Sequence, residues 1–464
     1  MRRARPRFPS VLVALALLAG LAAGCGGSED DGQQVSRPQV TLWSLEFEPD
    51  RVAATRANVA EFTRRTGIRV AVGVIGDGAL PARMAEALDQ GRVPDVVQMP
   101  LDSVHEYANA RVLDEAASED VIDRLGDDTF SQTALTLVTR EGRIAAVPSD
   151  GWGQLLVYRK DLFRQAGLSR PETVEDILAA ARRLDRGGRA GITLGTTPDQ
   201  FTSETFEHVA LAMGCNLVDD QARILLDSPE CRAAFRYYVD LARNYSVGGV
   251  QDVESTRDAY MAGRAAMILW SPFLLDALAG LRDDAQPTCP ECREDPAYLA
   301  RNSEVVGALS TKDGKPSQYA SVTTWAIPRG ADVEPAKRLV EYLLSDGYLR
   351  WLALSPQGKY PLRAGDVSNP TRFFDAWERL KSGVDRKARL REFYSESAMA
   401  AIRDGTRRFR RWGFDQGQAA LVGAMRGPQP VSRALARAIA GEQSADQAAT
   451  QARIAVERVQ RGQQ

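Results

Sequence analysis

The sequence has 464 residues, 44% of them hydrophobic, with 59 basic and 61 acidic side chains and a formal net charge of −2. The length leaves room for two or three domains, and the hydrophobic fraction is ordinary for a globular protein. The absence of a basic excess argues against nucleic acid as a partner.

The first 24 residues have the features of an export signal. Four arginines precede an apolar run of about 13 residues, which is shorter than the roughly 20 that a membrane-spanning helix needs. The stretch Leu-Ala-Ala-Gly-Cys at 21–25 resembles a bacterial lipobox, in which the cysteine carries the lipid and becomes the new N-terminus. The resemblance implies a signal peptide over 1–24, lipidation of Cys25 and anchoring to the outer face of the cell membrane.

The small, polar residues at 25–37 predict a solvated tether between the lipid and the folded protein. Without residues 1–24 the chain keeps 55 basic and 61 acidic side chains, which gives a net charge of −6.

An α/β pattern follows the tether. Strands are predicted at 39–43, 68–74 and 95–99, and helices at 50–65 and 80–90. This alternation indicates a mainly parallel sheet, and ligands of such sheets bind beyond the carboxyl ends of the strands. Trp43, Asp77 and Asp102 are therefore expected near one rim.

A second α/β series occupies the middle of the chain. Strands are predicted at 143–148, 155–158, 192–194, 266–270, 305–309 and 321–328; helices at 160–166, 173–184, 235–244, 257–263, 274–279 and 336–352. Thr173 is the expected N-cap of its helix. The glycine-flanked stretch 149–153 is expected to be a turn, and the last hundred residues are expected to be mostly helical.

Four cysteines remain if Cys25 carries lipid. An even number of cysteines outside the cell suggests disulfides, for which the sequence alone allows three pairings. We favour Cys215–Cys231 with Cys289–Cys292 because these pairs close two local loops.

The Cys289-Pro-Glu-Cys292 stretch has an alternative interpretation as half of a zinc site or as a redox motif. A zinc ribbon needs a second such pair, and the only histidines, His105 and His208, are distant in sequence. The sequence therefore predicts disulfides and neither a metal site nor a cofactor.

Two ordered blocks suggest a family. Residues 158–168 read Y-R-K-D-L-F-R-Q-A-G-L, and residues 261–267 read M-A-G-R-A-A-M. Together with A-I-P at 326–328 before a long helix, they resemble the family 1 extracellular solute-binding proteins of ABC transporters, which include the maltose-binding type. The resemblance covers roughly residues 38–365.

The resemblance implies an α/β, two-lobe periplasmic-binding-protein-like fold with a ligand cleft between the lobes and a helical C-terminal part. Lobe one would comprise 38–147 and 315–355, and lobe two 148–314 and 356–464. The chain would cross between lobes near 148–150, near 309–311 and after 355. Hinge closure of a monomer would be read by an ABC permease with a separate ATPase.

A sugar presents apolar C–H faces and a ring of hydroxyl groups, so its site needs flat aromatic rings and short polar side chains. The candidate ring-bearing residues are Trp43, Trp152, Trp270, Trp325 and Tyr360. The candidate polar residues are Glu46, Asp77, Asp102, Asp150, Glu204 and Arg363. Each has a structural alternative, because a tryptophan at a strand end can belong to the core and an aspartate after a strand can cap a helix.

Other functions remain open at this point. The same fold could bind a polyamine, an iron complex, an anion or a phosphorylated polyol, or could serve a non-transport sensor. An exported glycoside hydrolase would also need aromatics and two carboxylates. The chain has no G-x-S-x-G and no H-E-x-x-H motif, so an enzyme is not expected.

Overall fold

The computed structural model describes residues 40–76 and 78–462, which belong to one compact unit. The expected signal peptide, the whole tether with Cys25, and Asp77 lie outside the described residues. Within the described ranges, no helix is both long and apolar enough to cross a membrane.

The first lobe is built on a seven-stranded sheet. Three strands, β1 (Val40–Ser44), β2 (Val70–Val74) and β3 (Val96–Pro100), are parallel, and α1 (Pro49–Thr66) and α2 (Leu80–Asp89) connect them. The strand order is β11–β6–β10–β3–β1–β2 with β12 beside β10, where β6 is Val147–Gly153, β10 Gln318–Ala326, β11 Tyr360–Pro361 and β12 Phe409–Arg410. Because β10 is antiparallel to both β3 and β6, the sheet is mixed rather than mainly parallel.

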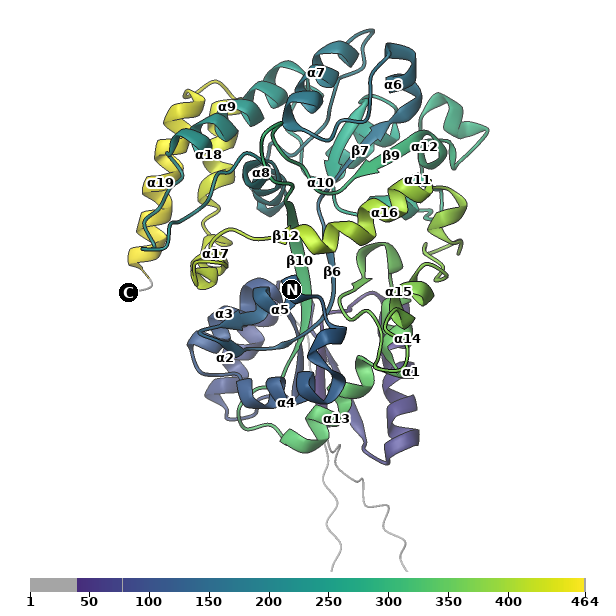
Figure 1. Ribbon diagram of the computed structural model, residues 1–464, viewed down its shortest axis with the longest axis vertical. Helices are drawn as coiled ribbons and strands as arrows, with labels where there is room; N and C mark the ends of the chain where they lie inside the picture. The colour runs from purple at the N-terminus through teal and green to yellow at the C-terminus, as the bar shows by residue number, and fades with distance from the viewer. Residues whose placement is uncertain (1–39, 77, 463–464) are drawn as a thin grey trace, which may run out of the picture. The chain divides into compact units, whose positions relative to one another are not determined.

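The second lobe contains a three-stranded antiparallel sheet. Its order is β8 (Met267–Trp270), β7 (Leu155–Arg159) and β9 (Ser303–Val306). Figure 1 shows the two lobes, with β6 and β10 running between them. β6 continues into β7 through Gln154, whose carbonyl accepts a hydrogen bond of 2.8 Å from Nε2 of Gln318 on β10.

Helices make up about half of the described residues. The first lobe also has α3 (Leu101–Asn109), α4 (Glu115–Leu125), α5 (Gln132–Val138), α13 (Val333–Leu343), α14 (Tyr348–Leu352) and α15 (Arg372–Trp377). The second lobe has α6 (Lys160–Ala166), α7 (Val174–Leu184), α8 (Gln200–Ala212), α9 (Pro229–Asn244), α10 (Val253–Met261), α11 (Leu274–Leu278) and α12 (Tyr298–Asn302). Next come α16 (Glu396–Gly405), α17 (Ala419–Met425), α18 (Pro430–Ile439) and α19 (Ala445–Arg461). Thr173 caps α7 as expected, and Asp176 completes a capping box.

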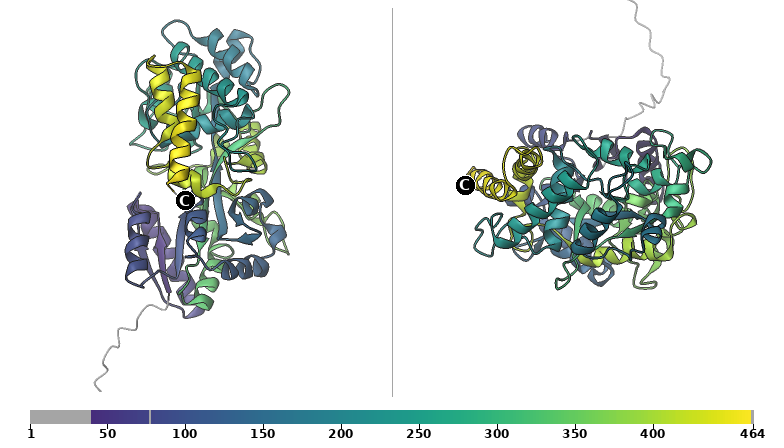
Figure 2. Two further views of the ribbon diagram at one scale, coloured as in Figure 1. Left: turned by 90° about the vertical axis from the view of Figure 1, so that its left-hand side faces the viewer. Right: turned by 90° about the horizontal axis from the view of Figure 1, so that it is seen from above.

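The C-terminal hundred residues divide between the lobes. β11 pairs with β6 in the large sheet, and α15 packs on β11. Residues 360–377 therefore lie with the first lobe, whereas the family pattern implied the second lobe for them. The helices α18 and α19 lie side by side on the second lobe (Figure 2).

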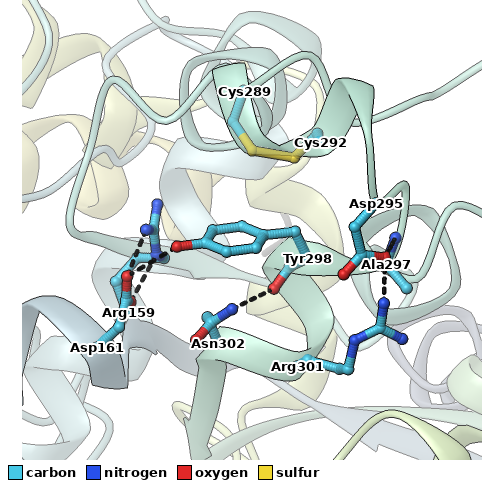
Figure 3. Close-up of a disulfide and its surroundings, with 9 residues drawn as sticks. All are labelled: Arg159, Asp161, Cys289, Cys292, Asp295, Ala297, Tyr298, Arg301 and Asn302. Atoms are coloured by element: carbon cyan, nitrogen blue, oxygen red, sulfur yellow. Dashed lines mark hydrogen bonds and ion pairs between the residues drawn. A yellow bond between two sulfur atoms is a disulfide. The ribbon is translucent and has the colours of Figure 1, made fainter.

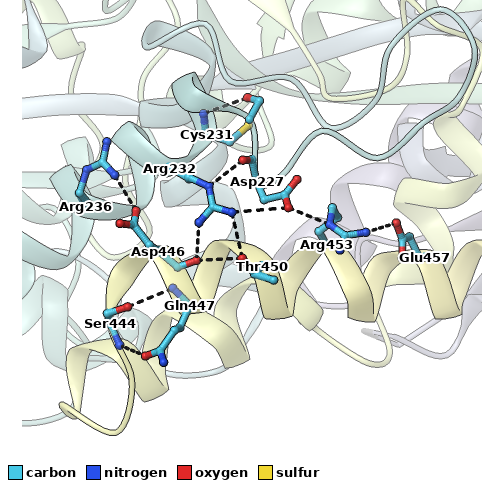
Figure 4. A network of polar contacts seen from close by, with 11 residues as sticks. Asp227, Cys231, Arg232, Arg236, Ser444, Asp446, Gln447, Thr450, Arg453 and Glu457 are labelled. Atoms are coloured by element: carbon cyan, nitrogen blue, oxygen red, sulfur yellow. Dashed lines mark hydrogen bonds and ion pairs between the residues drawn. The ribbon is translucent and has the colours of Figure 1, made fainter.

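Polar contacts fasten α19 to α9. Arg232 donates to the Asp446 carbonyl at 3.0 Å and to Thr450 Oγ1 at 3.1 Å (Figure 4). Arg236 pairs with the Asp446 carboxylate at 2.6 Å. These contacts and the packing of α18 against α19 place the last two helices with the second lobe.

The expected turn at 149–153 is wrong, because these residues form the second half of β6. A Cβ on Gly151 would lie 2.9 Å from the Ser321 carbonyl oxygen, and one on Gly153 would lie 2.4 Å from Nε2 of Gln318. The glycines therefore let β6 lie closely against β10, because glycine has no side chain to keep the two strands apart. The expected strand at 192–194 is reduced to isolated bridges.

Both expected disulfides form. Cys215–Cys231 joins the end of α8 to the start of α9, with an S–S distance of 2.06 Å. Cys289–Cys292 closes a short turn beside Tyr298 (Figure 3). The described residues contain no cluster of three or more side chains that could hold a metal ion.

Replacing each disulfide pair by alanines tests the loop-closure effect. Loss of Cys215–Cys231, with a separation of 16 residues, is expected to lower the free energy of unfolding by about 3 kcal/mol. Loss of Cys289–Cys292, with a separation of 3, is expected to cost about 2 kcal/mol by the same relation. Urea unfolding of the two double variants measures both values, and the reverse order would contradict this account.

Candidate functional site

The carboxyl ends of β1, β2 and β3 meet at one edge of the large sheet. The loops after these strands line a groove of about 410 Å³, with Leu45, Gly76 and Asp102 on one side and Gly423 and Arg426 of the α17 segment on the other. This volume lies within the range of small-molecule pockets. The groove is therefore a place where a small ligand would fit.

Arg411 joins the two lobes beside this groove. Its Nη1 lies 2.9 Å from Asp102 Oδ1 on α3, and its Nε donates to Glu207 Oε1 on α8 at 3.1 Å. Nη1 also donates to the carbonyl of Ala320 on β10 at 3.3 Å, and the guanidinium lies 4.6 Å from the centre of the Tyr319 ring. One buried cation thus contacts both lobes and the strand between them.

Asp102 and Glu204, both expected in the site, line a cavity of about 40 Å³ together with Glu207, Arg411 and Arg426. The cavity has room for bound water. Burial raises the pKa of Glu204 and Glu207, and the nearby Arg411 guanidinium opposes this effect. The cavity therefore offers carboxyl oxygens that can accept hydrogen bonds from hydroxyl groups.

Partly exposed aromatic rings occur near the second lobe's sheet edge, and we call Trp152, Phe201, Trp270 and Phe273 the aromatic group. The Trp152 and Phe273 ring centroids are 6.3 Å apart, as are those of Phe201 and Trp270. The Trp270 indole donates to the Val253 carbonyl at 3.1 Å, which fixes the ring. Rings held in this way provide flat apolar surfaces at low entropic cost.

Trp152 and Trp270 belong to adjoining parts of the fold. Trp270 is the last residue of β8 and pairs with Leu155 at the start of β7, and Trp152 lies three residues earlier on β6. Trp152 thus lies three residues along the chain from the residue that pairs with Trp270.

Glu46 and Asp150, also expected in the site, are engaged with Lys359 in a buried ion network. Lys359 Nζ lies 2.7 Å from Glu46 Oε1 and 3.5 Å from Asp150 Oδ1, and 4.2 Å from the centre of the Trp351 ring. The Trp351 indole donates to Asp150 Oδ2 at 2.6 Å. These carboxylates stabilise the first lobe and have little capacity left for a ligand.

The pKa shifts of this network follow burial and charge. Burial alone would raise the pKa of Glu46, but Lys359 and Arg51 bring it below its ordinary value. Burial raises the pKa of Asp150 in spite of Lys359. Burial would lower the pKa of Lys359, and the two carboxylates raise it. The lysine therefore stays charged.

Trp325 and Tyr360 lie in the core, contrary to the expectation that they face a ligand. Trp325 is 0% exposed and its ring centre lies 4.8 Å from that of Trp351. Tyr360 is 3% exposed and packs against Phe374 and Trp377. Neither ring has a surface that a ligand could reach in this structure.

Arg363 is also a core residue rather than a free donor. Its guanidinium donates to Thr129 Oγ1 at 3.0 Å, to the Leu344 carbonyl at 2.7 Å and to the Leu125 carbonyl at 2.8 Å. These acceptors occupy the nitrogens that were expected to hold a hydroxyl pair or an anion. Arg363 therefore fixes the loop after β11 to the first lobe.

Trp43 is half-buried, and its indole lies over Gly73 on β2, where a Cβ would be 2.8 Å from the ring. It packs partly against the core of the first lobe. Asp77 is outside the described residues.

The sequence did not single out Arg411, Phe201, Phe273 or Lys359. The run Arg-Phe-Arg-Arg-Trp at 408–412 carries several strong donors, but nothing in its spacing distinguishes the buried Arg411 from its exposed neighbours. Phe273 follows Trp270 by three residues, and this short spacing was the one sequence feature that pointed to Phe273 as a neighbour of the expected site.

Comparisons with known proteins identify the family of the chain. The family model described as bacterial extracellular solute-binding protein matches residues 48–349. A relative from Escherichia coli (strain K12), YcjN, whose name places it among ABC transporter periplasmic-binding proteins, is 26% identical over 368 residues. That match covers 78% of this chain and 81% of YcjN.

Solved structures show the same fold at low identity. Maltose-bound T. maritima MalE3 and the cyclic α-maltosyl-1,6-maltose binding protein of Arthrobacter globiformis each match with a TM-score of 0.67 and 18% identity, over 90% of this chain and 98% of theirs. An ABC transporter solute-binding protein from Thermotoga lettingae, bound with α-D-tagatose, matches with a TM-score of 0.66 and 21% identity, over 90% of this chain and 99% of its own.

Proposed function

The chain belongs to the bacterial extracellular solute-binding proteins, and from this membership we propose that it binds a sugar or oligosaccharide between its lobes and delivers it to an ABC permease. The family consists of binding proteins rather than enzymes, and it is extracellular. The ATPase that drives transport would be a separate partner.

The aromatic group is the observation that carries the choice of a sugar. Partly exposed indole rings of Trp152 and Trp270 lie near one edge of the second lobe, and Glu204 presents a carboxyl group from α8. The C–H face of a pyranose stacks on such rings while its hydroxyls donate to carboxyl oxygens. A polyamine would need clustered acids without a paired cation, whereas Asp102 and Glu207 are both paired with Arg411.

The N-terminal segment supports an anchored protein. Residues 21–25 fit a lipobox, so Cys25 would hold a monomer on the outer face of the cell membrane through a lipid alone. Metabolic labelling with a radioactive fatty acid would label the wild-type chain, and Cys25→Ala should abolish the label. Label retained in that variant would contradict the anchor.

Ligand binding should raise the melting temperature through mass action. A thermal-shift panel of monosaccharides, disaccharides, longer oligosaccharides, polyols, polyamines and phosphorylated polyols is expected to give a shift with one group of sugars. A flat response to every sugar with a shift for a polyamine or an anion would contradict the proposed ligand class.

Replacing Trp270 by alanine is expected to weaken the affinity for the selected sugar by at least about tenfold, because an aromatic platform contributes more than about 1.4 kcal/mol when it is a major contact. Titration calorimetry measures the Kd. Tyr245→Ala is the matched control, since Tyr245 is a half-buried ring of the same lobe that packs with Arg182. Equal affinities of the wild type and Trp270→Ala would contradict this role for Trp270.

A further inference from the structure

A tight contact between the lobes lies on α11. The short helix η3 (Pro356–Gly358) precedes β11 and is tied to the first lobe by Trp377, whose indole donates to the Pro356 carbonyl at 2.9 Å. Phe273, just before α11, packs directly on Gly358, where a Cβ would lie only 2.0 Å from the phenyl ring. Any side chain at position 358 would overlap the Phe273 ring, so the close contact between the two residues requires glycine at this position.

Beside this contact, Gln357 and Asp276 meet across the lobes. Gln357 Nε2 donates to Asp276 Oδ2 at 2.7 Å, and the two side chains belong to residues that are 3% and 0% exposed. Asp276 Oδ1 and Gln357 Oε1 are both buried and have no hydrogen-bond partner among the described residues. Two acceptors are therefore left over on the same pair of side chains.

A single proton on Asp276 would give both unpartnered oxygens, Asp276 Oδ1 and Gln357 Oε1, a hydrogen bond. A carboxylate has only acceptors, but a carboxylic acid has one O–H donor. If Asp276 Oδ1 carries the proton, it can donate to Gln357 Oε1 while Gln357 Nε2 donates to Asp276 Oδ2. The pair would then form an acid–amide ring in which both orphan oxygens take part in a hydrogen bond, as buried polar groups usually do.

Within residues 40–76 and 78–462, no cation lies within salt-bridge distance of Asp276. Among the charged groups around it, Arg282 is paired with Asp284 at 2.7 Å and Arg51 with Glu46 at 3.4 Å. Both arginines lower the pKa of Asp276 from a distance, but burial outweighs them and raises it to about 6.

Tyr394, another titratable neighbour of Asp276, uses its hydroxyl elsewhere. Tyr394 donates its hydroxyl to the Leu275 carbonyl at 2.7 Å. The backbone N–H of Ala277 gives the carboxylate some support. The remaining strong partner of Asp276 is therefore Gln357.

We propose that Asp276 holds a proton in this arrangement of the lobes and that the acid–amide ring with Gln357 is an acid-stabilised latch between α11 and η3. Ionisation removes the O–H donor and leaves a buried charge beside the Gln357 oxygen, so the latch weakens as the pH rises. This latch does not depend on which solute the protein binds.

Asp276→Asn is the sharpest test, because an asparagine amide keeps the shape and donates to Gln357 Oε1 at every pH. In the wild type, the infrared difference spectrum between pH 5 and pH 7.5 should contain the C=O band of a protonated carboxyl group that titrates with a midpoint near pH 6. Asp276→Asn should lack this band. Asp220→Asn, which removes an exposed carboxyl of the same lobe, should retain it.

Hydrogen exchange measures the latch itself. After correction for intrinsic rates, the amides of Gly358 and Lys359 in the wild type should exchange at least about threefold faster at pH 7.5 than at pH 5. In Asp276→Asn the corrected rates should be equal at the two pH values. A wild type without the carboxyl band, or an Asp276→Asn protein that keeps the pH-dependent exchange, would overturn the proposal.

Discussion

Arg411→Met is expected to lower the free energy of unfolding by about 3–5 kcal/mol, because it removes the buried cation that pairs with Asp102 and Glu207. The Arg411 side chain is 3% exposed, so the carboxylates that it leaves behind are shielded from bulk solvent. The methionine also removes the hydrogen bond to the Ala320 carbonyl and the stacking on Tyr319. Chemical unfolding of the wild type and the variant measures the difference.

Arg426→Met is the matched control for this prediction. Arg426 lies 3.6 Å from the same Asp102 carboxylate, but its side chain is 46% exposed, and exposed pairs contribute about 0–1 kcal/mol. Adding Asp102→Asn and Glu207→Gln to Arg411→Met removes the stranded charges and should recover part of the loss. If Arg411→Met cost no more than Arg426→Met, the buried network would not join the lobes as described.

His208 should make the protein sensitive to acid. The ring is 0% exposed on α8, its Nδ1 accepts a hydrogen bond of 3.3 Å from the Tyr319 N–H, and its Nε2 has no partner among the described residues. Burial lowers the pKa of His208 to about 3 from an ordinary value of 6.5. The folded state therefore excludes a proton that the unfolded chain binds.

The sign of the effect follows from proton linkage. The stability that neutral His208 provides is fully present above pH 6.5 and is lost as the pH falls from 6.5 towards 3, at about 1.4 kcal/mol per pH unit. His208→Gln keeps an acceptor for Tyr319 and does not titrate. Between pH 7 and pH 4.5 the wild type should lose about 2–3 kcal/mol more than this variant, as measured by urea unfolding. Parallel pH profiles would contradict the assignment.

The sequence predicts most of the fold because its local signals act over short distances. Thr173 and Asp176 cap α7, Gly67 ends α1, and the alternation of strands and helices in residues 40–100 appears in the structure. The failures involve partners far away in the chain. Gly151 and Gly153 resemble turn glycines until β10, some 170 residues later, is placed beside them.

The site was predictable only in part for the same reason. Trp152 and Trp270 are partly exposed, and Asp102 and Glu204 line one cavity, so these four residues stay candidates for ligand contact. Trp325 is in a central strand, and its ring faces the core. A tryptophan at the rim of the cleft would have the same sequence pattern, so the sequence could not distinguish the two positions.

The charged residues show more clearly what cannot be predicted from sequence spacing. Glu46 and Asp150 are neutralised by Lys359, and Asp102 by Arg411. Each cation is more than 200 residues from at least one of its carboxylate partners, so no local pattern reveals these pairs. Sequence spacing can find a carboxylate at a rim, but not whether a distant cation occupies it.

The central claim is that a sugar binds between the lobes against the aromatic group. A crystal structure with the sugar selected by thermal shift tests this most directly. The account predicts a sugar ring stacked on Trp270 or Trp152 with a hydroxyl donating to Glu204. Clear density for the sugar on the outer face of either lobe, with these rings uncovered, would contradict it.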